Sequence, residues 1–148
     1  MFRQLLLLAA AVAVAAGPGI KGQYIGGTLA SIAAKSDATL DLTAPDALTF
    51  RFKNTELRIG YGKINTLEYG QNVSRRYAAA VLVSPVLLLS KSRKHFVTIG
   101  YEDAEGKQQA MVFRIEKGDI RWLLTSLEAR TGRRIEYQDN EARKSGKG

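Results

Sequence analysis

The 148-residue sequence contains no cysteine, and it has only one histidine, one tryptophan and three prolines. The absence of cysteine excludes a disulfide framework, a cysteine nucleophile, a lipid-bearing cysteine and the cysteine–histidine spacings of zinc sites. A folded domain in this chain must therefore be held together by its apolar core alone. With 45% apolar and 24% charged residues, the composition is globular, and the length suits one domain with a single core.

Acidic residues are also scarce relative to basic ones. The chain has 22 Lys and Arg residues against 14 Asp and Glu residues, which gives a formal net charge of +8. This excess favours an anionic partner, such as lipid head groups, nucleic acid or an acidic polymer, without choosing among them.

The amino terminus, MFRQLLLLAAAVAVAAGPG, has the three-part pattern of a secretory signal peptide. Arg3 supplies the positive charge, an apolar run extends from Leu5 to about Ala16, and a helix-breaking Gly-Pro-Gly follows. The sequence therefore predicts a signal peptide over residues 1–16 and export to the periplasm or the outer face of the cytoplasmic membrane. The alternative is an uncleaved amino-terminal anchor, although Lys21 ends the run before the roughly 20 apolar residues that spanning requires.

Seven segments after residue 22 alternate between apolar and polar residues, which is the pattern of half-buried strands. They are residues 23–30, 38–43, 47–53, 56–61, 63–71, 95–103 and 107–117. The clearest is ALTFRFK, which places Leu48, Phe50 and Phe52 on one face. The pattern predicts a mainly β domain.

The period then changes to that of an amphipathic helix in GDIRWLLTSLEARTG. The residues expected to share its apolar face are Ile120, Leu123, Leu124 and Leu127. We expect Asp119 to cap the start of this helix and Gly132 its end. Trp122 either packs at the margin of the core or stands on the surface as an anchor. Residues 138–148 are predicted to form a disordered polar tail.

Seven short strands followed by one amphipathic helix is the element order of the pleckstrin-homology (PH) superfold, GRAM-type domains included, which this chain resembles. The resemblance implies a seven-stranded open barrel or sandwich over residues 23–137, with the carboxy-terminal helix closing one end. Residues 94–132 are also similar to exported bacterial proteins that share a Lys-His strand entry, a hairpin closed by glycine and the helix end LEARTG. Neither resemblance supplies catalytic residues, and the PH superfold carries many functions.

No constellation of reactive side chains is apparent in the sequence. His95 could act as a base, but a single histidine without a partner is typical of a polar residue at a strand edge. The acidic cluster at residues 102–105 lacks the spacing of a calcium-binding loop, and the glycine motifs lack the helix that follows a phosphate-binding loop. The sequence therefore predicts a binding module that is not an enzyme and that uses no cofactor or metal.

The most distinctive segment is RRYAAAVLVSPVLLLSKSRKH, in which basic clusters flank an apolar run from Tyr77 to Leu89. One interpretation is a pair of core elements that turn at Pro85. A second is a hairpin that enters one membrane leaflet, because thirteen helical residues reach only about 20 Å and the hydrocarbon core measures about 30 Å. A third is an exposed patch that binds an envelope protein or a second copy of this chain.

The membrane interpretation makes specific assignments within this insertion at residues 75–94. The predicted contacts with an anionic surface are Arg75, Arg76, Lys91, Arg93 and Lys94. The residues predicted to insert are Val81, Leu82, Val86, Leu87 and Leu88. Apolar insertion and charge together supply the two signals that stable peripheral attachment requires. The alternative is an interaction or oligomerisation module of the cell envelope.

Nucleic acid is a less suitable partner. It would require exposed aromatic rings among the cations, for which Tyr69, Tyr77 and Phe96 are the candidates. Export from the cytoplasm argues against this partner.

Overall fold

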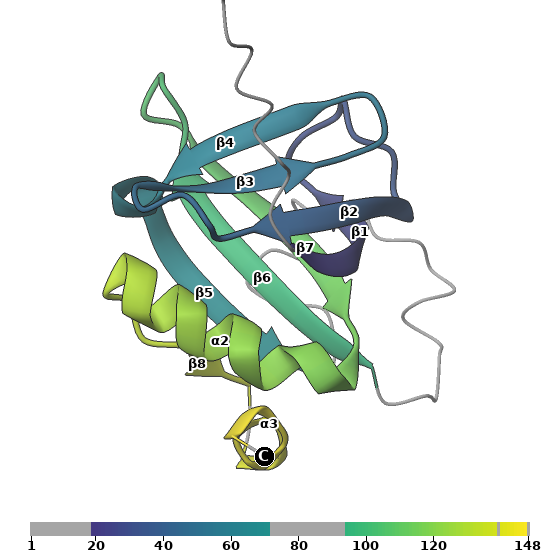
Figure 1. Cartoon of the computed structure of the whole chain (residues 1–148), viewed down its shortest axis with the longest axis vertical. Coiled ribbons are helices and arrows are strands. Elements are labelled where there is room, and N and C mark those ends of the chain that lie inside the picture. The colour runs from purple at the N-terminus through teal and green to yellow at the C-terminus, as the bar shows by residue number, and fades with distance from the viewer. Residues whose placement is uncertain (1–18, 72–93, 139, 148) are drawn as a thin grey trace, which may run out of the picture.

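The computed structural model describes residues 19–71, 94–138 and 140–147 (Figure 1). The predicted signal peptide and residues 75–93 of the basic-flanked insertion lie outside these ranges. The described part is mainly β, with a carboxy-terminal helix packed on the sheet, which confirms the predicted fold class. The seven predicted strands correspond to the first seven strands of the structure.

One sheet contains all eight strands of the described chain. They are β1 (Ile20–Gly27), β2 (Ser36–Asp41), β3 (Ala47–Arg51), β4 (Glu56–Gly60), β5 (Ile64–Gly70), β6 (His95–Glu102), β7 (Gln108–Ile115) and β8 (Glu136–Tyr137). The helices are the short 3-10 turn η1 (Tyr61–Lys63), α2 (Lys117–Thr131) and α3 (Asn140–Lys147).

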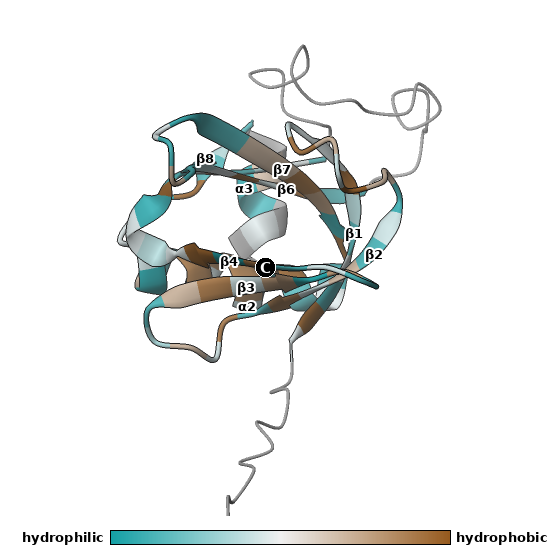
Figure 2. Ribbon diagram, turned by 90° about the horizontal axis from the view of Figure 1, so that it is seen from above, coloured by the Kyte–Doolittle hydropathy of each residue, from teal (hydrophilic) through white to brown (hydrophobic). Residues whose placement is uncertain are grey.

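The strand order is β4-β3-β2-β1-β7-β6-β5-β8. Neighbouring strands are antiparallel except for β5 and β8, which are parallel. Strand β1 pairs with both β2 and β7 and so joins the two halves of the sheet, which curl into two layers (Figure 2). Because β4 and β8 do not pair with each other, the barrel stays open, and α2 lies beside its β5–β6 wall (Figure 1).

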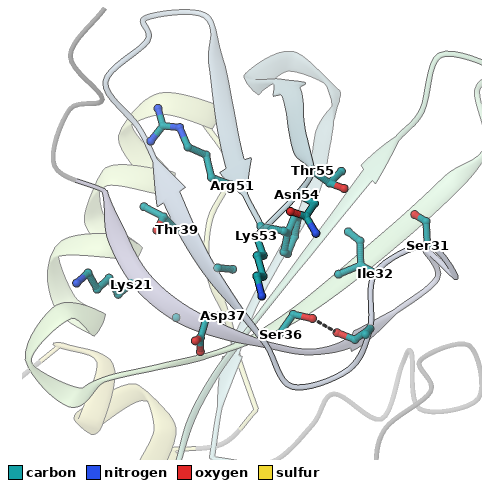
Figure 3. A pocket seen from close by; sticks show the side chains of 14 residues that line it. Lys21, Ser31, Ile32, Ser36, Asp37, Thr39, Arg51, Lys53, Asn54 and Thr55 are labelled. Atoms are coloured by element: carbon teal, nitrogen blue, oxygen red, sulfur yellow. Dashed lines mark hydrogen bonds between the residues drawn. The ribbon is translucent and has the colours of Figure 1, made fainter.

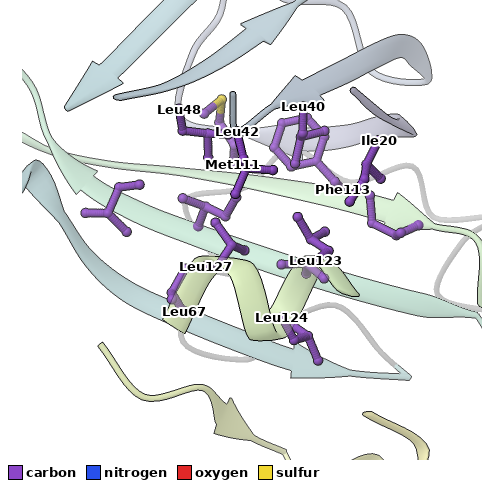
Figure 4. Packing of buried hydrophobic residues seen from close by; sticks show 14 of the residues in the cluster. Ile20, Leu40, Leu42, Leu48, Leu67, Met111, Phe113, Leu123, Leu124 and Leu127 are labelled. Atoms are coloured by element: carbon purple, nitrogen blue, oxygen red, sulfur yellow. The ribbon is translucent and has the colours of Figure 1, made fainter. Parts of the chain in front are cut away.

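The core lies between the two halves of the sheet and α2 (Figure 4). Phe50 of β3 stacks on Phe113 of β7, with ring centroids 5.3 Å apart and planes 8° apart. The helix contributes the four buried residues that its period predicted, Ile120, Leu123, Leu124 and Leu127. Burial of each such side chain stabilises the fold by about 1.5–3 kcal/mol. The helix is therefore a wall of the core.

One end of α2 agrees with the prediction and the other does not. Gly132 ends the helix in the left-handed conformation, with φ 69°, and its N–H donates to the carbonyl of Glu128 at 2.9 Å, as expected. The start lies earlier than expected, because Glu116 is the N-cap residue and makes no side-chain capping bond. Asp119 therefore lies in the first turn, where its negative charge still suits the helix dipole.

The carboxy terminus differs from the predicted disordered tail. Gln138 continues from β8 and donates its N–H to the Tyr69 carbonyl at 3.1 Å, and α3 follows. Ala142 and Gly146 are buried one helical turn apart, and a methyl group at Gly146 would lie 2.8 Å from the ring of Tyr137. These small residues let α3 approach the aromatic rings closely, which explains why so polar a segment packs on the domain.

Candidate functional site

The basic-flanked insertion leaves and re-enters the sheet at one place. Gly70, the last residue of β5, pairs with Phe96 near the start of β6. Gln71 and Lys94 are therefore neighbours at the same end of the barrel, although 22 residues separate them in the sequence. In the sequence, Arg75 and Arg76 follow Gln71 by four and five residues, and Lys91 and Arg93 precede Lys94 by three and one, so both ends of the segment that carries the basic clusters attach to the domain at this strand pair.

Of the ten residues predicted to contact a membrane, the structure places one. Lys94 is partly exposed at the entry to β6. The other nine lie outside the described residues: Arg75, Arg76, Val81, Leu82, Val86, Leu87, Leu88, Lys91 and Arg93. Residues 72–93 carry four cations and no acid, so they supply +4 of the formal net charge of +8.

A tyrosine–histidine pair lies beside this common base. The hydroxyl of Tyr69 is 2.6 Å from Nδ1 of His95, and the two rings stack with planes 7° apart. Tyr137 of β8 meets Tyr69 edge-on at 6.0 Å, and the guanidinium of Arg143 lies 5.9 Å from the centre of the Tyr137 ring. The pair fixes the strand ends from which the insertion emerges. Sequence analysis missed this partner of His95 because β5 and β6 are adjacent only in the fold.

The environment of His95 favours the neutral ring. Burial lowers the pKa of His95, and the nearby Lys117 lowers it further, while Glu116 opposes the shift. A neutral ring with its proton on Nε2 accepts a hydrogen bond from Tyr69 at Nδ1. This arrangement orients the histidine ring in the wall of the barrel.

A second feature is a groove of about 870 Å³ between the β1–β2 loop, β2 and the end of β3 (Figure 3). Lys21, Lys53 and Asp37 are exposed charged residues on its walls, and Ser31 and Asn54 add polar groups. Because the charges have opposite signs, the groove is not a strongly anionic or cationic site. The residues that line it include no histidine or cysteine.

Arg51 also lines the groove, but its guanidinium is already paired with carboxylates. It forms ion pairs with Asp41 and, at 3.4 Å, with Glu56. Asp41 is buried and also accepts hydrogen bonds from the N–H and hydroxyl of Thr43, at 2.8 and 2.6 Å. Burial alone would raise the pKa of Asp41, but these hydrogen bonds and Arg51 outweigh it, so the pKa is lowered. The carboxylate therefore holds β2 and β3 together.

The aromatic residues singled out in the sequence have different environments. Trp122 is 55% exposed on the outer side of α2, which agrees with the surface alternative. Tyr69 and Phe96 are buried, so neither offers a free ring for stacking on a nucleic-acid base, and Tyr77 lies outside the described residues.

No protein-family model matches this chain, and no curated protein is significantly similar to it. In the described ranges, no helix has both the length and the apolar character needed to cross a membrane. Those same ranges contain no cluster of three or more side chains able to hold a metal ion.

Proposed function

We propose that this chain is an exported, non-enzymatic binding module of PH-like fold, and that it attaches to an anionic membrane surface through its basic-flanked insertion. The observation that carries the proposal is the pairing of Gly70 with Phe96. This pairing means that the segment carrying the two cationic clusters and the apolar run is attached at both of its ends to the same end of the barrel. Separate clusters on opposite sides of the domain could not meet one flat surface together.

The electrostatic free energy of membrane attachment follows from the number of cations. A cation near an anionic leaflet contributes about 1 kcal/mol, so the five predicted contacts supply about 5 kcal/mol before screening. Salt at physiological strength reduces this, since the Debye length is then about 8 Å. Insertion of apolar side chains between the clusters would add the second signal that stable attachment needs.

Flotation with vesicles of phosphatidylcholine and phosphatidylglycerol tests the proposal, using the chain without residues 1–16. Glutamine replaces the five predicted contacts, Arg75, Arg76, Lys91, Arg93 and Lys94. The matched control removes five exposed cations elsewhere, Lys35, Lys63, Lys107, Arg133 and Arg134. We expect the first variant to lose at least tenfold in vesicle partitioning and the control to lose less than threefold. Equal losses would show that net charge alone, not the insertion, attracts the membrane.

A protein-interaction module is the second candidate, and Trp122 favours it. Exposed tryptophan is enriched at the centres of protein interfaces, and Trp122 is the large apolar side chain that stands exposed in the described structure. Size-exclusion chromatography without lipid separates the two functions. A complex of two or more copies that Trp122→Ala or Leu87→Asp dissociates would support the interaction module instead.

A further inference from the structure

The sheet has a second buried face, on the side away from the barrel core. Along β6 and β7, side chains alternate between the two faces of the sheet. Val97 and Ile99 of β6, and Met111 and Phe113 of β7, belong to the core cluster. The intervening residues must point outward.

These outward residues are nevertheless buried, and we call them the outer patch. It consists of Ile25, Phe96, Thr98, Ala110 and Val112, with exposures of 0, 5, 2, 0 and 0% respectively. The register makes the patch continuous, because Thr98 pairs with Val112 and Val112 pairs with Gly26 beside Ile25. None of its four apolar members belongs to the core cluster.

An uncovered face of an antiparallel sheet is exposed to water and carries polar residues. The outer patch is buried within a single chain, so its cover belongs to the same chain. The β1–β2 loop begins in the plane of the sheet, where the Thr28 N–H donates to the Ala110 carbonyl at 3.0 Å and so extends the β1–β7 pairing. Leu29 and Ile32 of this loop pack on the core cluster instead, and so does the apolar face of α2. Within residues 19–71, 94–138 and 140–147, these elements leave Phe96, Thr98 and Val112 without an identified cover.

We propose that the outer patch is a docking surface for the chain's own apolar run, Tyr77–Leu89. The run belongs to the segment that leaves after Gln71 and returns at Lys94, beside Phe96 at the border of the patch. Strands lie about 4.8 Å apart, so crossing from β5 to β1 covers about 14 Å. An extended chain of 22 residues spans up to about 73 Å, which is ample for crossing and returning. Alanine, valine and leucine dominate the run and match the apolar patch.

Docking would give the insertion a second role, which is to regulate membrane attachment. This part of the inference rests on the proposed function. The same valine and leucine side chains cannot cover the patch and enter a leaflet together. Docking therefore competes with lipid insertion, and it keeps a strongly apolar run away from other chains while no membrane is present. The docking itself requires no lipid and can be tested without any.

Thiol reactivity provides the test, because the natural chain has no cysteine. Single variants Leu82→Cys, Val86→Cys, Leu87→Cys and Leu88→Cys are treated with a thiol reagent in buffer. Thr125→Cys, on the exposed side of α2, is the control. We expect at least one thiol of the run to react tenfold or more slowly than the control. In urea all five should react alike.

A second variant locates the docking surface. A double variant combines Thr98→Cys with the cysteine of the run that reacts most slowly, and it should form an intramolecular disulfide under mild oxidation. Thr125→Cys combined with the same cysteine should not. Protected thiols with no cross-link to residue 98 would overturn the assignment to the outer patch. Reaction of all four thiols at the control rate in the folded protein would overturn docking altogether. Protection that disappears on dilution would assign the patch to a second copy and overturn docking within one chain.

These outcomes are distinguishable from the flotation result. Failure of docking would leave vesicle binding unaffected, and failure of vesicle binding would leave the thiol protection in place. If both proposals hold, Val112→Ala, which weakens the patch, should increase vesicle partitioning and speed the thiol reaction together.

Discussion

Replacement of Leu123 by alanine tests whether α2 is a wall of the core. Leu123 is fully buried and faces the sheet from the middle of the helix. Alanine removes three carbon groups, each worth about 0.8 kcal/mol when buried, which gives about 2.4 kcal/mol. The cavity left behind adds to this, so we expect a loss of about 3–4 kcal/mol, within the 2–5 kcal/mol range of such substitutions.

The neighbouring Trp122 supplies the matched control. It occupies the same turn of α2 but is 55% exposed, so Trp122→Ala should cost less than about 1 kcal/mol. Both changes introduce alanine into the same helix, so a difference between them reflects burial and not helix propensity.

Urea unfolding followed by far-ultraviolet circular dichroism measures both variants, since Trp122→Ala removes the only tryptophan. With an m-value of about 2 kcal/mol per molar urea, Leu123→Ala should lower the midpoint by about 1.5–2 M. A loss below 1 kcal/mol for Leu123→Ala, or an equal loss for Trp122→Ala, would refute the packing of α2 described above.

Two further predictions concern backbone conformation and pH. Gly132→Ala should destabilise the fold by about 1 kcal/mol, because Gly132 has positive φ. Gly118→Ala in α2 should instead stabilise the fold by roughly 0.5 kcal/mol. Melting temperatures that change in the same direction in both variants would contradict this contrast. Because the pKa of Asp41 is lowered on folding, the folded state binds fewer protons than the unfolded state near that pKa. The stabilisation by the Asp41 carboxylate is therefore present above pH ~4 and is lost as the pH falls through the pKa of the folded state. Asp41→Asn should therefore lower the free energy of unfolding by about 1.5–3 kcal/mol at pH 7. It should also reduce the fall in melting temperature as the pH drops from 5 to 2. An equal fall in the two proteins would refute the assignment.

Much of the barrel could be predicted from the sequence because its strands alternate. Leu48 and Phe50 are buried on one side of β3, and Met111 and Phe113 are buried on one side of β7, as the period of two indicated. The apolar face of α2 and its glycine end followed from spacing in the same way. These features depend on local pattern, which a single sequence contains.

The features that the sequence did not predict depend on contacts between distant segments. β6 and β7 were interpreted as strands with one buried face, although the consecutive run Ala110–Phe113 is typical of a strand buried on both. The partnership of Tyr69 with His95 required the pairing of β5 with β6. Helix α3 has few apolar residues, and its packing becomes apparent only when Tyr137 is placed beside Gly146.

The two-residue strand β8 has a consequence for how the domain behaves among copies of itself. A sheet that stops at β5 would present a row of free amide and carbonyl groups, which is a template for pairing with another chain. The returning carboxy-terminal segment occupies part of that row, and Glu56 and Arg58 place charges on β4 at the opposite border. One border of the sheet is thus partly paired and the other carries charge, which disfavours strand-to-strand association between copies of the domain at high concentration.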